Sequence, residues 1–185
     1  LVCTRSGSHP YNISLFATVV ERLGDAKGEA WLKGVVDNMA RAPKGGDTDQ
    51  IKAVASGECG VALTNTYYLA RMIKSTKPED RAVVERIKVV FPNQGTTGTH
   101  INIAGAAVAK HAKNRESAMA FMEFLATPFA QDYFANGNNE FAAANGVKID
   151  NAALKAMGGD KFKAEQIPLS VVAKNLTKVP VSYTH

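Results

Sequence analysis

Apolar residues recur every three to four positions over several stretches of the chain, which is the spacing of a helix with one buried face. The pattern predicts a first helix over Tyr11 to Leu23, ended by Gly24. It predicts further helices over residues 28–40, 47–57, 66–73 and 78–86, and two more whose first turns follow Asn114 and Thr127.

Short apolar runs between these helices have the length of buried strands. They lie at residues 2–4, 60–65, 87–91 and 101–108. Because strands alternate with helices, the sequence predicts an α/β layer fold with a largely parallel sheet. The Phe and Met residues between 119 and 134 are predicted to be core, and Asp47 is predicted to cap its helix with Gln50 three positions on.

Composition places the chain among ordinary globular proteins. It has 185 residues, of which 45% are apolar and 21% charged, and its net charge is +5 (22 Lys+Arg − 17 Asp+Glu). Its longest apolar run, Ile101 to Ala109, is too short to span a membrane. The basic residues are scattered, so nucleic-acid binding is not favoured, and no catalytic or nucleotide-binding motif is present.

Two cysteines, Cys3 and Cys59, occur in apolar, strand-like surroundings. Two buried thiols are the favoured interpretation, and a single disulfide is the alternative. Nothing in the sequence places Cys59 beside His100 as a nucleophile and its base.

The most informative local feature is Asn65-Thr-Tyr-Tyr68, which follows a predicted buried strand and opens a helix. Ligands of open α/β sheets gather at such strand ends. Both rings could pack in the core, but adjacent side chains are expected to diverge. The other interpretation is a hard-metal site, since only a strongly Lewis-acidic cation such as Fe(III) displaces the phenol proton at neutral pH.

A second loop, Ser6-Gly-Ser-His-Pro-Tyr-Asn12, also joins a strand to a helix N-terminus. Amide groups in such a loop can bind an anion. Tyr11 is expected to face the same cleft as Tyr67 and Tyr68, or else to be an ordinary buried tyrosine beside an N-cap. His9 is either an exposed loop residue or, less favoured, a ligand.

With these residues, the sequence resembles the periplasmic ferric iron-binding proteins of ABC importers, which are two-lobed substrate-binding proteins of type II. The resemblance covers residues 1 to 176 and is carried by residues 3–15, 46–58, 65–71, 99–105, 118–128 and 139–141. It implies an α/β fold of the type II periplasmic binding proteins, comprising the C-terminal lobe and the segment that returns to the N-terminal lobe.

The resemblance also implies how the chain is organised. Residues 1–93 are expected to form the C-terminal lobe, and residues 94–177 a crossover strand with helices that pack on both lobes. Residues 178–185 are expected to be a non-native tail. Because the N-terminal lobe would precede Leu1, apolar surface is expected to be exposed around residues 100–140.

By resemblance, Tyr67 and Tyr68 are the paired tyrosinate ligands of Fe(III), and Tyr11 is the additional tyrosine ligand of one subgroup. The positions that hold a synergistic carbonate or phosphate are Ser6, Gly7, Ser8 and Asn65. Arg71 lies one helical turn beyond Tyr67, where its charge would favour the deprotonated phenols.

The implied function is capture of ferric iron in the periplasm, as a monomer without catalysis, and delivery to an ABC permease in the inner membrane. A second hypothesis is a type II binding protein for an oxyanion, a polyamine or thiamine. An enzyme on the same fold is the third, but no acid–base or nucleophile constellation supports it.

Overall fold

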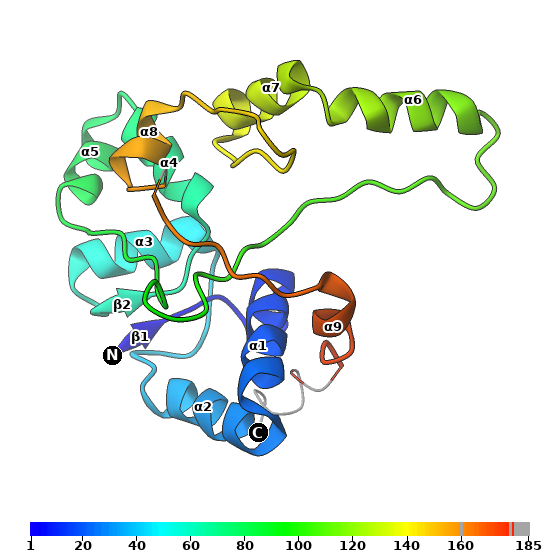
Figure 1. Ribbon diagram of the computed structural model, residues 1–185. Helices are drawn as coiled ribbons and strands as arrows, with labels where there is room; N and C mark the ends of the chain where they lie inside the picture. The colour runs from blue at the N-terminus through cyan, green and yellow to red at the C-terminus, as the bar shows by residue number, and fades with distance from the viewer. Residues whose placement is uncertain (160, 178, 180–185) are drawn as a thin grey trace. The chain divides into compact units, whose positions relative to one another are not determined.

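The computed structural model describes residues 1–159, 161–177 and 179 (Figure 1). The chain forms two compact units. The first unit comprises Leu1–Asn102 and Lys161–His185, and the second comprises Ile103–Asp160. The chain therefore passes from the first unit into the second at residue 102 and returns at residue 161.

The first unit is built around two short parallel strands, β1 (Val2–Cys3) and β2 (Val61–Ala62), in the register Val2↔Val61 and Cys3↔Ala62. The helices of this unit are α1 (Pro10–Leu23), α2 (Asp25–Asp37), α3 (Asp47–Ser56), α4 (Thr66–Lys74), α5 (Pro78–Val84) and α9 (Leu169–Ala173). The predicted α/β order with parallel strands is confirmed for this unit (Figure 1).

The helix ends follow from local chemistry. α1 begins with Pro10 at its first turn and His9 as the N-cap, and it ends at Gly24, whose φ of 77° is accessible to glycine at little cost. The predicted cap of α3 is wrong by one residue. Gly46 is the N-cap, and the backbone N–H of Gly46 donates a hydrogen bond to the Asp49 carboxylate at 2.8 Å.

Two predicted strands are not strands. Residues 87–91 and 101–108 have no regular secondary structure. A strand requires a hydrogen-bonded neighbour, and apolar composition alone does not supply one. In the part of the chain described, Val90 is 76% exposed, and the only pairing next to the second segment is an isolated bridge between Thr99 and Ala164.

The main core of the first unit lies between α1, α2 and α9. Its buried members are Phe16, Ala17, Val20, Leu32, Val172 and Val179. The apolar face predicted for the first helix is therefore buried at Phe16 and Val20, whereas Leu23 at its end is 42% exposed. The predicted tail, residues 178–185, lies outside the described residues except for Val179.

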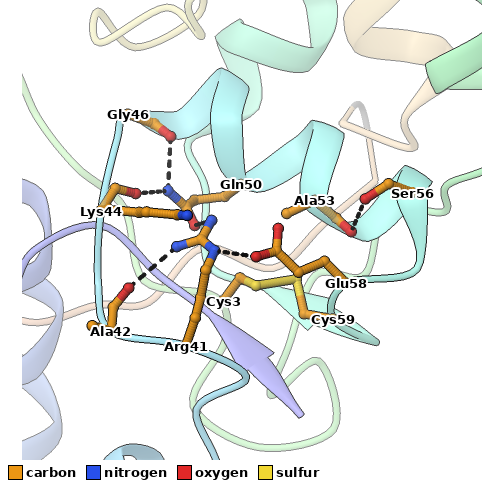
Figure 2. Close-up of a disulfide and its surroundings, with 10 residues drawn as sticks. All are labelled: Cys3, Arg41, Ala42, Lys44, Gly46, Gln50, Ala53, Ser56, Glu58 and Cys59. Atoms are coloured by element: carbon orange, nitrogen blue, oxygen red, sulfur yellow. Dashed lines mark hydrogen bonds and ion pairs between the residues drawn. A yellow bond between two sulfur atoms is a disulfide. The ribbon is translucent and has the colours of Figure 1, made fainter.

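A disulfide between Cys3 and Cys59 forms a second buried cluster with Ala53, so the favoured interpretation of two free thiols is wrong. Figure 2 shows the Arg41 side chain beside this bridge, where its Nε lies 2.8 Å from Glu58 Oε1. The bridge joins β1 to the residue two positions before β2. It also excludes Cys59 as a nucleophile.

The second unit contains α6 (Arg115–Leu125), α7 (Pro128–Asn138) and α8 (Ala152–Ala156). Buried Asn151 caps α8 and donates to Ala135 O at 2.7 Å and to Asn139 Oδ1 at 3.1 Å. The prediction that the aromatic residues of 119–134 are core is wrong for most of them. Exposed apolar side chains include Met119, Phe121, Phe124, Phe129 and Tyr133.

The segments that lead into and out of the second unit are bonded to each other in the first unit. Thr99 N donates to Lys163 O, and Glu165 N donates to Thr99 O, both at 2.8 Å. The Glu165 carboxylate accepts from Arg22 Nε at 2.7 Å, and one of its oxygens lies 3.8 Å from His100 Nδ1. Within the described residues, no helix has the length and apolar character of a membrane span.

We expect the disulfide to stabilise the first unit strongly. Closing a loop across a sequence separation of 56 residues contributes about 4 kcal/mol in the chain-entropy treatment. Replacing both cysteines by alanine should lower the free energy of unfolding by about this amount. Urea unfolding followed by fluorescence of the single tryptophan, Trp31, measures it.

The parent protein kept in reductant is the control, because it should unfold like the double variant, while reductant should leave the variant unchanged. A loss below about 1 kcal/mol would contradict this role of the disulfide.

We also expect stability to fall on mild acidification because of His100. Burial lowers the pKa of His100 below its ordinary 6.5, and the nearby Glu165 carboxylate opposes this only in part. The unfolded chain therefore binds more protons than the folded chain just below pH 6.5, and the free energy of unfolding falls as the pH drops through that window.

Urea titrations between pH 7.5 and 5 should show this slope in the parent and a flatter one in His100→Gln. The matched control is His111→Gln, at an exposed histidine, which should keep the slope. Equal slopes in the parent and His100→Gln would show that His100 does not titrate in this way.

Candidate metal-binding site

The site forms where the two parallel strands end. Each strand runs directly into a loop that opens a helix: β1 leads to α1, and β2 leads to α4. Tyr11 is the second residue of α1, and Tyr67 and Tyr68 are the second and third residues of α4. Because the strands are parallel and adjacent, both helix N-termini lie at the same edge.

The structure brings the three tyrosines together, and each is half-buried. The rings of Tyr67 and Tyr68 lie 4.5 Å apart, tilted by 35°, so the expectation that they diverge is wrong. Side-chain hydrogen bonding links the Tyr67 hydroxyl to Tyr11 and Tyr68, and Asn65 Nδ2 donates to it at 3.1 Å. Helix α4 therefore presents both phenols to the Tyr11 loop.

Two guanidinium groups lie against these rings. Arg71 Cζ is 5.6 Å from the centre of the Tyr67 ring and 5.1 Å from that of Tyr68, as its spacing on the helix predicts. Arg5 Cζ is 5.4 Å from the centre of the Tyr11 ring. Positive charge at this distance favours the ionised form of a phenol.

The environment nevertheless favours the neutral form of the Tyr67 and Tyr68 phenols in the absence of a bound cation. Burial is the largest cause that raises the pKa of Tyr67 well above 10, and hydrogen bonding with Tyr11 raises it further. The pKa of Tyr68 is also raised, chiefly by burial, with contributions from Tyr11 and Asp47. A ligand that takes these oxygens as phenolates must therefore displace protons.

The loop predicted to bind an anion is bonded within itself. Ser6 Oγ and Ser8 Oγ are 2.9 Å apart, and Ser8 N donates to Ser6 Oγ at 3.3 Å. Both serines are exposed and Gly7 is buried. His9 is half-buried, and its ring lies 4.6 Å from the ring of Tyr11. Its Nδ1 caps α1 by accepting from Tyr11 N at 3.3 Å.

Sequence reasoning missed a buried polar network behind the tyrosines. Arg5 donates to the carboxylate of Asp47 and to Asn12 Oδ1, the latter at 2.8 Å. One feature of the sequence indicates this network: Asn12 lies four residues before Phe16, so this polar residue falls on the buried face of α1. The sequence pattern by itself predicts only a capping role for Asp47.

Other familiar metal-binding arrangements are absent from the part of the chain that the structure describes. It contains no group of three or more His, Cys, Asp and Glu side chains close enough to hold an ion. The tyrosine cluster offers several oxygen donors at one point. Phenolate oxygens are hard donors, which suit a hard, highly charged ion.

The profile of a family described as bacterial extracellular solute-binding protein matches residues 13–157. Among curated proteins, iron uptake protein A2 of Synechocystis is 48% identical over 170 residues, which are 90% of this chain and 49% of that protein. The Fe(3+)-binding periplasmic protein of Serratia marcescens is 27% identical over 171 residues, 88% of this chain and 48% of that protein.

Comparison with solved structures also finds iron-binding proteins. A Trichodesmium protein in complex with iron and citrate has a TM-score of 0.93 and 44% identity, over 99% of this chain and 57% of that one. The ferric binding protein from Campylobacter jejuni has a TM-score of 0.90 and 39% identity, over 99% of this chain and 57% of that one. The chain spans about half the length of the relatives it matches.

The raised pKa values predict how the site titrates without metal. Ultraviolet absorbance between pH 8 and 13 should show a phenol that ionises well above pH 10, because burial and hydrogen bonding disfavour the phenolate of Tyr67. Tyr67→Phe should reduce the amplitude of that late phase, to which Tyr68, whose pKa is also raised, still contributes. Tyr133→Phe, at a tyrosine that is 70% exposed and outside the cluster, should leave it in place.

A parent titration in which every phenol ionises with a midpoint near the ordinary value of about 10 would contradict this description, provided that circular dichroism shows the protein folded throughout.

Proposed function

The chain belongs to the bacterial extracellular solute-binding protein family, and from this premise we propose that it captures ferric iron for an ABC importer. Its fold is that of the type II periplasmic binding proteins, matched over about half the length of the solved chains. The observation that carries the proposal is the cluster of Tyr11, Tyr67 and Tyr68 at the ends of two parallel strands.

The chemistry of three phenols selects a trivalent hard cation. Each phenol that loses its proton neutralises one unit of charge, so three phenolates neutralise Fe(III). The raised pKa values of Tyr67 and Tyr68 mean that a weak Lewis acid does not displace their protons at neutral pH. Fe(III) is acidic enough to do so, whereas Ca²⁺ and Mg²⁺ prefer carboxylate, carbonyl and water oxygens.

Each residue then has a role. Tyr11, Tyr67 and Tyr68 are the iron ligands contributed by this chain, and the Arg71 guanidinium stabilises the phenolates of α4. The loop Ser6-Gly7-Ser8, with the Asn65 side chain, holds a synergistic carbonate or phosphate. The exposed hydroxyls of this loop and the contact from Asn65 Nδ2 to the Tyr67 oxygen support that position.

Relatives about twice as long support a second lobe. We propose that residues 1–93 belong to the C-terminal lobe, and that residues 94–177 cross toward an N-terminal lobe that supplies the remaining ligands. The exposed apolar face of α6 and α7 is the surface this lobe covers. Closure of the two lobes buries the ion, and the closed monomer delivers it from the periplasm to a permease in the inner membrane.

The test is a titration of the full-length protein with ferric citrate, followed by visible absorbance. Ferric phenolate complexes absorb visible light, so the parent should develop a charge-transfer band. Tyr67→Phe/Tyr68→Phe should abolish the band and weaken ferric binding on the order of 100-fold or more. Loss of a residue that only hydrogen-bonds to a metal ligand typically lowers metal affinity about 10–100-fold, and loss of two ligands should lower it further.

Tyr133→Phe is the matched control and should leave both the band and the affinity unchanged. Titrations with and without bicarbonate or phosphate test the anion loop, since a synergistic anion should strengthen the band. A folded parent that shows no band would overturn the ferric assignment and favour the hypothesis of an oxyanion, polyamine or thiamine ligand.

A further inference from the structure

A buried ion pair lies directly behind the tyrosine cluster. Arg5 follows β1 by two residues, and Asp47 is the first residue of α3. The two residues are 2% and 1% exposed, and Arg5 Nη1 donates to Asp47 Oδ1. The pair therefore joins the end of one strand to a helix that lies between the two strands in the sequence.

On the Asp47 side, the pair holds the loop that carries Tyr67 and Tyr68. The same Oδ1 atom accepts a second hydrogen bond, from the backbone N–H of Asn65, at 2.6 Å. Asn65 is the N-cap of α4, and it also contacts the Tyr67 hydroxyl through Nδ2 at 3.1 Å. The Asp47 carboxylate thus fixes the point at which α4 begins.

On the Arg5 side, the pair holds the loop that carries Tyr11. Arg5 Nη2 donates to Asn12 Oδ1 at 2.8 Å. Asn12 is fully buried and uses its own Nδ2 to donate to Arg5 O at 2.8 Å and to Ser6 O at 2.9 Å. The Arg5 guanidinium also lies over the Tyr11 ring.

Stability alone gives a weak reason for such a pair. Desolvation of two buried charges commonly offsets their attraction, so apolar residues of similar volume often stabilise a fold equally well. Arg5 retains a further cost, since its buried Nε finds no hydrogen-bond acceptor among the described residues. The arrangement is better explained by the geometry it imposes on the two loops.

We propose that Arg5 and Asp47 are positioning residues for the iron site: their ion pair sets the distance between Tyr11 on one loop and Tyr67 and Tyr68 on the other. This rests on the proposed ferric function. The arginine fork is essential to it, because one planar group must bond Asp47 and Asn12 at the same time. The pair is electrically neutral as a whole, so it orients the phenols without adding net charge.

The experiment compares four variants of the full-length protein by ferric citrate titration, the wavelength of the phenolate band and thermal unfolding. Asp47→Ala removes the acceptor of Asn65 N–H, and Arg5→Lys keeps the charge but loses the fork. Arg5→Met/Asp47→Leu replaces the pair by apolar side chains. Glu165→Gln, the control, breaks the ion pair with Arg22 in the same unit, away from the tyrosines.

We expect Asp47→Ala and Arg5→Lys to weaken ferric binding about 10–100-fold and to shift the band, as loss of an outer partner does at other metal sites. The apolar double variant should regain thermal stability relative to Asp47→Ala but keep the shifted band and the weak binding. Glu165→Gln should lower the unfolding temperature and leave the band and affinity at parent values.

If Asp47→Ala fails to fold, the apolar double variant still tests the proposal, because it removes the ion pair without leaving one charge unpaired. A double variant or an Arg5→Lys variant with the parent band and affinity would overturn the positioning role. A parent without a band would overturn the ferric function, and this proposal with it, so the two failures are distinguishable.

Discussion

The parallel pairing of β1 with β2 is the constraint on which the rest of the site depends. The strands are only two residues long, so the backbone ladder by itself is weak. The Cys3–Cys59 disulfide ties β1 to the residues just before β2, and the Arg5–Asp47 ion pair joins the loops beyond the strands. Two helix N-termini that are distant in sequence are thereby held at one edge, with their tyrosines in contact.

The electrostatics of that edge suit capture and release of a cation. Burial and mutual hydrogen bonding keep the phenols of Tyr67 and Tyr68 protonated when no metal is bound, which avoids two uncompensated buried charges. Arg71 offsets part of the cost when the protons leave. In the proposed function, iron binding is coupled to proton release, so acidification favours the empty site.

Sequence reasoning recovered the features that depend on local patterns. The face of α1, the stop at Gly24 and the common location of Tyr11, Tyr67 and Tyr68 follow from periodicity and strand–helix order. Prediction from the sequence failed for features that depend on contacts between residues distant in the chain. Residues 87–91 do not form a strand in the described structure, although their composition is apolar. The Cys3–Cys59 disulfide depends on how the two strands pair, and Arg5 and Asp47 form their ion pair across 42 positions of sequence. The aromatics of α6 are predicted to be core from their helical spacing, but local periodicity does not show whether a neighbouring surface covers them.

The most direct measurement of the central claim is resonance Raman spectroscopy of the full-length protein loaded with Fe(III), with the laser tuned to its visible absorption. If Tyr11, Tyr67 and Tyr68 bind the iron as phenolates, the spectrum should be dominated by tyrosinate ring vibrations, and these should shift when ring-deuterated tyrosine is incorporated. A loaded protein whose enhanced vibrations are insensitive to that label would contradict the account, because the iron would then be held by other ligands.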